Sequence, residues 1–263
     1  MLDSIIESHR GITGVAVVKG DDVIVAGDTA QLPLMSIFKL HIAIAVLDKG
    51  VSVDSVISVD ASMLRENTYS PLRDKTGVRD IEISVDSLLY YSVCRSDNNA
   101  CDILIDLVGG VGRVDSCIRK LGITDFVLTE TENSMHEDIS RSYNNRSTPE
   151  ALCRVMEALY TGRALPSEPT AYLTGLLEKS RTGREKIAAG IPAGAFLGHK
   201  SGMSDRTNDG IRMATGDVAA FRCGDGSKAY IAILVKDSPE ADEESAAIFR
   251  DLSSSVFESY SGR

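Results

Sequence analysis

The chain has 263 residues, of which 43% are hydrophobic and 25% are charged, an ordinary composition for a globular protein. This length can bury a proper hydrophobic core, either as one large domain or as two interlocked lobes. The formal net charge of −10 argues against nucleic acid as a partner, because phosphate binding needs a basic face.

The N-terminal segment shows no export signal. Its first ten residues, MLDSIIESHR, lack a basic start and an apolar centre. The longest apolar run, Leu40 to Leu47, is far too short to cross a bilayer. We therefore expect no membrane span.

A short helix and a β-hairpin are predicted at the start of the chain. Residues 2–9 are compatible with one short helix. The runs Thr13–Val18 and Val23–Ala26 are rich in β-branched residues and flank the turn sequence Lys19-Gly20-Asp21-Asp22. This pattern predicts two strands joined by a tight turn.

The middle of the chain is predicted to be helical. Ser36 opens an apolar helix that ends near Gly50, which puts this serine at the positive end of a helix dipole. From residue 60 to about residue 180 the pattern predicts mainly helices and loops. The best-marked helix has Thr148 as its N-cap and Pro149 in its first turn.

After Gly190 the pattern returns to strands. The expected elements are three strands and a last helix, at Ala195–His199, Val218–Cys223, Ala229–Val235 and Pro239–Tyr260. Both chain ends therefore build one antiparallel sheet, which predicts an α+β fold. We expect a single domain, with a sheet lobe from residues 1–35 and 186–263 and an inserted helical lobe from residues 36–185. A cleft between the lobes would hold a small ligand.

One fragment, Ser36-Ile37-Phe38-Lys39, sets a serine and a lysine one helical turn apart on the same face. The amine can lower the cost of removing the hydroxyl proton, which serine needs before it attacks a carbonyl. Alone, this spacing also fits a helix cap followed by a surface lysine. Three further fragments favour the chemical interpretation: Ser96-Asp97-Asn98, Glu132 followed by Met135-His136, and Lys200-Ser201-Gly202.

The ordered set resembles the class A serine β-lactamases, whose motifs include Ser-x-x-Lys, Ser-Asp-Asn and Lys-Thr-Gly. The intervals between the fragments are similar to those of the family, with no net insertion or deletion. The resemblance runs from about Gly14 to the C-terminus. It implies the fold of the β-lactamases and transpeptidases, with a helical lobe inserted into a sheet lobe.

The resemblance also implies a role for each residue of the first two fragments. Ser36 is the nucleophile that becomes acylated, and Lys39 is the base or the charge beside it. Ser96 passes a proton to the departing lactam nitrogen, and Asn98 binds the amide of the substrate's side chain. Asp97 would hold the turn that presents them.

Glu132 distinguishes an enzyme that hydrolyses its acyl ester from one that stays acylated. Hydrolysis of the ester needs an activated water, and a carboxylate opposite Ser36 activates that water. An acidic surface loop would also explain this glutamate, since Glu130, Glu137 and Asp138 lie nearby. Met135 and His136 follow at the spacing of the family's loop. The Met-His pair is similar to a smaller subgroup rich in cephalosporinases, where the histidine replaces an amide that helps hold the deacylating water.

The last fragment would form one wall of the cleft. Lys200 and Ser201 are expected to bind the carboxylate that β-lactams carry. Gly202 lets substrate approach the strand closely. The backbone N–H groups of Ser36 and Met203 would form the oxyanion hole.

Two further assignments rest on the resemblance. An extra arginine usually supports the substrate carboxylate; Arg206 and Arg212 are the candidates, and we favour Arg206. Tyr69 resembles the family's aromatic residue on the cleft wall, although a turn tyrosine is the competing interpretation.

No cofactor or metal is expected. His9, His41 and His199 offer no pair with metal-ligand spacing, and no Gly-x-Ser-x-Gly elbow suggests a Ser-His-Asp hydrolase. Some relatives have a disulfide where this chain has Ala43 and Leu89, so that bridge should be missing. Most of the five cysteines are expected to be reduced and buried.

The sequence therefore predicts a serine β-lactamase that hydrolyses penicillins and cephalosporins and confers antibiotic resistance. The alternatives are a penicillin-binding D,D-peptidase and a β-lactam-sensing domain that stays acylated. We expect a monomer whose partner is a small β-lactam. Family members act in the periplasm or outside the cell, so we expect a periplasmic or secreted protein whose export signal is replaced by a start codon.

Overall fold

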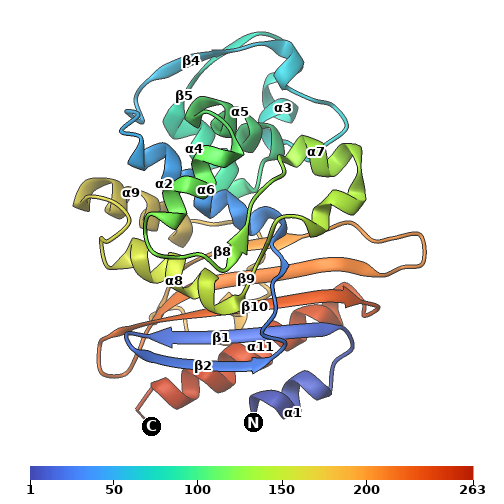
Figure 1. The fold of residues 1–263 in the computed structure, drawn as a ribbon, viewed down its shortest axis with the longest axis vertical. Coiled ribbons are helices and arrows are strands. Elements are labelled where there is room, and N and C mark those ends of the chain that lie inside the picture. The colour runs from blue at the N-terminus through green and yellow to red at the C-terminus, as the bar shows by residue number, and fades with distance from the viewer. Residues whose placement is uncertain (263) are drawn as a thin grey trace.

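Both ends of the chain meet in one antiparallel sheet, ordered β2-β1-β10-β9-β8 (Figure 1). Its strands are β1 (Ile12–Lys19), β2 (Asp22–Gly27), β8 (Phe196–Met203), β9 (Arg212–Arg222) and β10 (Lys228–Ser238). The structure is a computed structural model that describes residues 1–262, so residue 263 of the expected sheet lobe lies outside the described residues. The predicted α+β fold is confirmed.

The three central strands of this sheet, β1, β10 and β9, are buried on both faces. Side chains alternate between the two faces of a strand. In β1, Ala16 and Val18 belong to the core that includes α8 (Pro149–Tyr160). Val15 and Val17 belong to a second core, under α11 (Asp242–Tyr260). Helices on both faces explain why the strand sequences are continuous apolar runs.

The helical part of the molecule is built around α2 (Lys39–Asp48), whose residues 39–47 are all buried. A helix that is apolar on all sides must be surrounded by other elements. This cover comes from α4 (Val85–Arg95), α5 (Asn98–Val108), α6 (Val111–Arg119) and α9 (Ser167–Glu178). The other α-helices of residues 1–262 are α1 (Leu2–Glu7), α3 (Pro71–Thr76), α7 (Glu132–Glu137) and α10 (Ile187–Gly190).

Short strands interrupt the region predicted to be mainly helices and loops. One pair is β4 (Val56–Val59) and β5 (Ile81–Ser84). The other small sheet joins β3 (Leu32–Pro33), β7 (Arg146–Ser147) and β6 (Phe126–Val127). Strands of two to four residues are too short to show an apolar alternation in the sequence.

Several local predictions are confirmed, and one boundary differs. Lys19 pairs with Asp22 in the predicted hairpin, and the Thr148 side chain accepts a hydrogen bond from Ala151 N as an N-cap. The helix predicted to open at Ser36 begins instead as a 3₁₀ turn over Met35–Phe38 and becomes α-helical at Lys39. Ser36 thus lies in the tighter turn before the helix.

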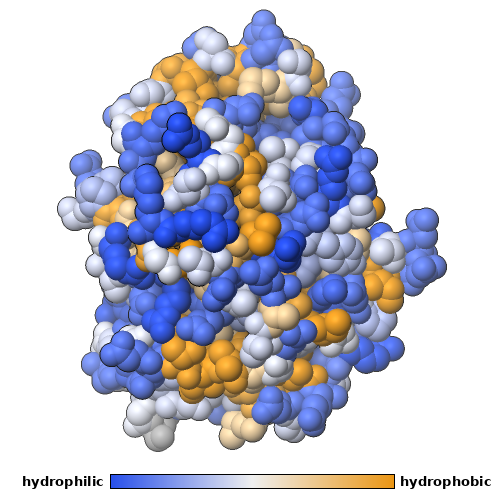
Figure 2. Space-filling view, viewed as in Figure 1, coloured by the Kyte–Doolittle hydropathy of each residue, from blue (hydrophilic) through white to orange (hydrophobic). Residues whose placement is uncertain are grey.

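The surface is mostly hydrophilic in the view of Figure 2, apart from separate apolar patches. One patch lies over the sheet edge, where Val23, Ile24 and Val25 of β2 are exposed. Within residues 1–262, no helix has both the length and the apolar character needed to span a membrane.

All five cysteines are free and buried. Ala43 and Leu89, where some relatives have a bridge, are buried apolar side chains. The prediction that most of the cysteines are buried is confirmed.

Candidate active site

Ser36 lies in the 3₁₀ turn at the start of α2, and its side chain contacts both residues proposed to activate it. Its Oγ accepts a hydrogen bond from Lys39 Nζ at 2.8 Å and donates one to Glu132 Oε1 at 3.2 Å. The preceding residue, Met35, has φ of 46°, a left-handed conformation that is strained for a residue with a side chain. This turn aims Ser36 out of the helix and into the cleft.

The Lys39 ammonium connects three of the four sequence fragments. It is fully buried, and besides Ser36 it donates to Ser96 O at 2.9 Å and to Asn98 Oδ1 at 2.6 Å. It also forms an ion pair with Glu132 Oε1 at 2.7 Å. These oxygen partners offset the cost of burying the ammonium, because an unpaired charge in the interior is costly.

The fourth fragment joins the site through Lys200. Its Nζ donates to Ser96 Oγ at 3.1 Å and to Ser201 O at 2.8 Å. Burial, and then the positive charge of Lys39, lower the pKa of Lys200 to about 7. Ser96 itself has φ of 57° at the end of α4, which turns its hydroxyl towards this lysine.

Asp97 holds the turn between α4 and α5, as predicted. Its carboxylate accepts hydrogen bonds from Ala100 N at 2.9 Å, from Leu72 N at 2.6 Å and from the Ser70 hydroxyl. It is fully buried and does not enter the cleft. Its neighbours Ser96 and Asn98 do line the cleft.

Asp102 was not predicted from the sequence, and it positions Glu132 by binding the backbone at the start of α7. Its carboxylate accepts hydrogen bonds from Glu132 N and Asn133 N, both at 2.8 Å. Burial, and then the charge of Glu132, raise the pKa of Asp102 to about 7. One signal was available, since Asp102 follows Asn98 by four residues and so shares its helix face.

The cleft consists of two adjoining cavities of about 220 and 340 Å³ that share Ser36, Tyr69, Asn98 and Met203. His136 lines the first cavity, whereas Ser96, Ser201 and Gly202 line the second. The structure thus brings together every residue of the sequence-predicted site except one, Arg206.

Gly202 brings strand β8 close to the nucleophile. A Cβ at this position would lie 2.6 Å from Leu34 O and 2.9 Å from Ser36 N. Only glycine permits this approach, because a side chain would push the strand away from the turn. The close contact puts Met203, the next residue, beside Ser36 at the cleft.

Arg206 is not brought into the cleft. Its guanidinium donates to Gly210 O and Glu240 O and forms an ion pair with Asp242 at 2.6 Å. Arg212 does line the second cavity, but its guanidinium is bound to Ser204 O and to the same Asp242. The predicted loop arginine thus lies beside Arg212 at the start of β9, where an acidic residue at the start of α11 binds it.

Lys186 is a second residue that sequence reasoning missed. It is buried beside Ser201 and Gly202 in the lining of the second cavity. Its Nζ donates to Gly202 O at 3.0 Å and to Thr215 Oγ1 at 2.7 Å. Burial lowers its pKa to about 8. No local signal marks it, since a lysine in a run rich in arginine and lysine resembles an exposed residue.

Comparison with known proteins shows the family of this chain. The model of the β-lactamase enzyme family matches residues 1–260. A β-lactamase of Bacteroides uniformis is 38% identical over 98% of this chain and 89% of its own length. The extended-spectrum β-lactamase PER-1 of Pseudomonas aeruginosa is 29% identical over 98% of this chain and 85% of its own. A crystal structure of a class A β-lactamase from Bacteroides cellulosilyticus superposes with a TM-score of 0.95 and 38% identity, covering 100% of this chain and 96% of that one.

Proposed function

This chain belongs to the β-lactamase enzyme family, as a class A serine enzyme, and from that premise we propose how its cleft opens a β-lactam ring. It hydrolyses the β-lactam amide bond and so confers antibiotic resistance. The observation that carries the proposed mechanism is that Lys39 Nζ and Glu132 Oε1 both contact Ser36 Oγ, at 2.8 and 3.2 Å.

In acylation, Ser36 Oγ attacks the lactam carbonyl and its proton passes to the Glu132 carboxylate, or to Lys39 once the Lys39 ammonium has given a proton to Glu132 across their 2.7 Å contact. The backbone N–H groups of Ser36 and Met203 stabilise the oxyanion, and losing one such donor typically costs roughly 10²–10³ in rate. Ser96 protonates the departing nitrogen, and Lys200, which donates to the Ser96 hydroxyl, favours that transfer.

In deacylation, Glu132 directs a water onto the ester. The carboxylate is nearly buried, and its backbone N–H is held by Asp102. A buried carboxylate beside the ester is the feature that a penicillin-binding peptidase or a β-lactam sensor would lack. Its position therefore favours turnover over a stable adduct.

The substrate carboxylate would bind at Lys200 and Ser201, with Lys186 as the second cation. Lys186 takes the place of Arg206 in this assignment, because its charge is buried directly behind the wall formed by Ser201 and Gly202. Both arginines nearby are instead paired with Asp242.

The substrate's acyl side chain would lie in the first cavity, between Asn98, Tyr69 and His136. Preference for cephalosporins is a proposal that rests on the Met135-His136 pair. Faster turnover of benzylpenicillin than of cephalosporins would refute it. We also propose that the enzyme is a monomer acting in the periplasm or outside the cell, which size-exclusion chromatography and cell fractionation would test.

The experiment that tests the mechanism compares the parent enzyme with Glu132→Gln by intact-protein mass spectrometry after mixing with a penicillin. The parent should turn over rapidly and show no lasting adduct, whereas the variant should accumulate one acyl group on Ser36. A parent that stays acylated would favour the peptidase or the sensor. Rapid multiple turnover by Glu132→Gln would remove Glu132 from its proposed role.

A further inference from the structure

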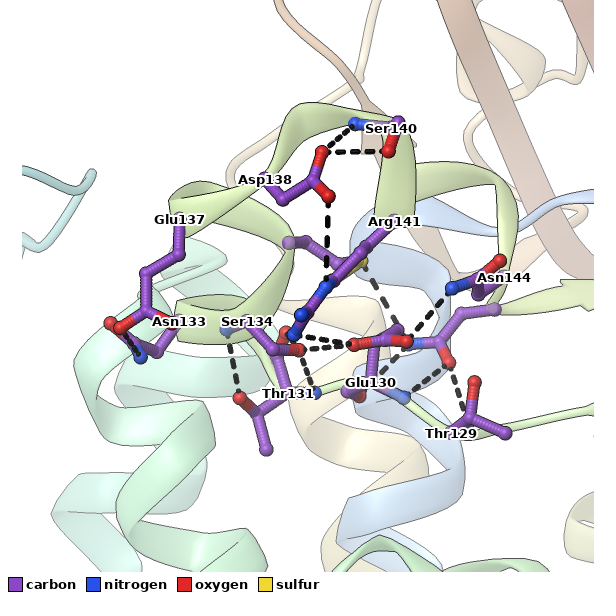
Figure 3. Close-up of polar contacts among 12 residues, drawn as sticks. Thr129, Glu130, Thr131, Asn133, Ser134, Glu137, Asp138, Ser140, Arg141 and Asn144 are labelled. Atoms are coloured by element: carbon purple, nitrogen blue, oxygen red, sulfur yellow. Dashed lines mark hydrogen bonds and ion pairs between the residues drawn. The ribbon is translucent and has the colours of Figure 1, made fainter.

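The two ends of the loop that carries Glu132 meet at another acidic residue, Glu130 (Figure 3). Its Oε2 accepts a hydrogen bond from Ser134 Oγ at 2.6 Å, on the α7 side of the loop. Its Oε1 accepts one from Asn144 Nδ2 at 2.8 Å, on the far side. The Arg141 guanidinium lies 3.9 Å from Oε2. One carboxylate thus ties together segments ten residues apart.

The backbone of Glu130 is held as firmly as its side chain. Asn145 Oδ1 accepts hydrogen bonds from Thr129 N at 2.9 Å and from Glu130 N at 3.0 Å. Asn145 Nδ2 donates to Glu130 O at 3.0 Å. Asn145 is fully buried, so this contact fixes the carboxylate of Glu130 relative to the core.

A chain of contacts connects Glu130 to the first turn of α7. Ser134 has one hydroxyl proton, and donating it to Glu130 leaves the lone pairs of Oγ free to accept. Ser134 Oγ accepts from Thr131 N at 3.0 Å, and Ser134 N donates to Thr131 Oγ1 at 3.1 Å. Thr131 immediately precedes Glu132, so the orientation of the Ser134 hydroxyl bears on where Glu132 begins the helix.

The charge of Glu130 is supported by its surroundings. Burial alone would raise its pKa, but the hydrogen bonds from Ser134 and Asn144, together with Arg141, lower it. The side chain is only 13% exposed. Glu137 lies in the same loop and is 60% exposed, with Asn133 and Arg65 as its contacts. Glu130 is therefore largely buried and connects the two ends of the loop, whereas Glu137 is exposed and does not.

We propose that Glu130 is a positioning residue for deacylation, which closes the loop around α7 and so holds the Glu132 carboxylate against Ser36. This inference rests on the proposed role of Glu132. Without the clamp the first turn of α7 can shift, and a misplacement of about 1 Å at a reacting group can cost roughly 10²-fold in rate. Water attack on the ester is the step that needs this placement.

The test is Glu130→Gln, with Glu137→Gln as the matched control. A glutamine keeps one accepting oxygen but turns an N–H₂ group towards the second donor and loses the charge opposite Arg141. With a penicillin we expect kcat and KM to fall together by roughly 10- to 100-fold, with an acyl adduct on Ser36 visible by quenched mass spectrometry. Glu137→Gln should stay within about twofold of the parent.

Two results for Glu130→Gln would overturn the proposal. The first is a kcat equal to that of the parent, with no acyl adduct. The second is an equal loss of kcat and of kcat/KM, again with no acyl adduct. If Glu130→Gln does not fold, Ser134→Ala carries the test, since it removes one partner of the clamp and should give the same adduct. A parent enzyme that does not turn over would instead refute the proposed function, so the two failures are distinguishable.

Discussion

Two lysine side chains, Lys39 and Lys200, are fully buried at the active site, and the charge of Lys39 lowers the pKa of Lys200. Lys39 has a carboxylate partner, Glu132 at 2.7 Å. Within residues 1–262, the hydrogen-bond acceptors of Lys200 Nζ are the Ser96 hydroxyl and the Ser201 carbonyl. Burial, and then the positive charge of Lys39, leave Lys200 with a pKa of about 7. In the mechanism proposed above, the substrate carboxylate supplies an anion beside Lys200.

The depressed pKa of Lys200 predicts how activity depends on pH. Below about pH 7 the free enzyme presents an ammonium to the substrate carboxylate, and above it an increasing fraction presents a neutral amine. We expect kcat/KM, which reports the free enzyme, to fall as pH rises through about 7. Lys200→Arg keeps its charge and should move this fall to higher pH. Identical profiles for parent and variant up to pH 9 would contradict the assignment.

Lys186 predicts a separate effect on substrate affinity. Lys186→Met removes the buried charge behind Ser201 while filling a similar volume, so KM for a β-lactam with a free carboxylate should rise about tenfold, with a smaller change in kcat. Lys186→Arg should retain most of the affinity. The methyl ester of the same substrate provides the control, because it has no charge for Lys186 to attract. An equal rise in KM for acid and ester would show that the lysine acts only on the structure.

The residues that sequence reasoning could identify are those with a fixed spacing. Lys39 follows Ser36 by one turn of helix, and Ser96 and Lys200 stand within short motifs. Asp102 and Lys186 could not be identified from motifs, because their roles come from contacts made across the fold. Arg206 was wrongly assigned to the cleft for the same reason, because the residue that binds it, Asp242, is thirty-six residues away in the sequence.

At the scale of elements, the active site depends on how closely β8 approaches the 3₁₀ turn before α2. Elements with a long periodic pattern, such as α8 and the strands of the main sheet, were predictable because many residues report one periodicity. The turn at Ser36 was predicted as regular helix, because its geometry is set by Met35 and by contact with Gly202 rather than by propensity.

This contact predicts that Gly202→Ala is far more harmful than an ordinary glycine substitution. The new Cβ would lie 2.6 Å from a backbone oxygen, so β8 and the nucleophile turn must separate. We expect kcat/KM to fall roughly 100-fold and stability to fall by about 1–3 kcal/mol. Gly175→Ala in α9 is the control, because its Cβ would meet nothing within 4 Å. That variant should be fully active and about 0.5–1 kcal/mol more stable in chemical denaturation. Parent-like activity of Gly202→Ala would show that the strand can shift without cost to catalysis.

At the scale of the whole molecule, an acidic protein surrounds a cleft with buried cations. The net charge is −10, yet Lys39, Lys186 and Lys200 lie within or behind the cleft wall. An anionic substrate is repelled by the overall field, so its capture depends on these local charges. We propose that the division into a sheet lobe (residues 1–35 and 186–263) and an inserted helical lobe (residues 36–185) serves this purpose, since both lobes supply a cation to the junction. Separate expression of residues 36–185 tests the division, and a fragment that binds β-lactam on its own would refute it.

Without a disulfide, the stability of the whole molecule rests on its two apolar cores, and this predicts the behaviour of the thiols. All five cysteines are free and buried. Burial raises the pKa of Cys94 to about 11 and that of Cys117 to about 12, and the thiolate is the reactive form. We therefore expect almost no reaction with Ellman's reagent in the native protein and five reactive thiols after denaturation. Dithiothreitol should leave the thermal midpoint unchanged, because there is no cross-link whose loss would release the unfolded chain. A midpoint that falls on reduction, or fewer than five thiols in the denatured protein, would reveal a bridge and contradict this account.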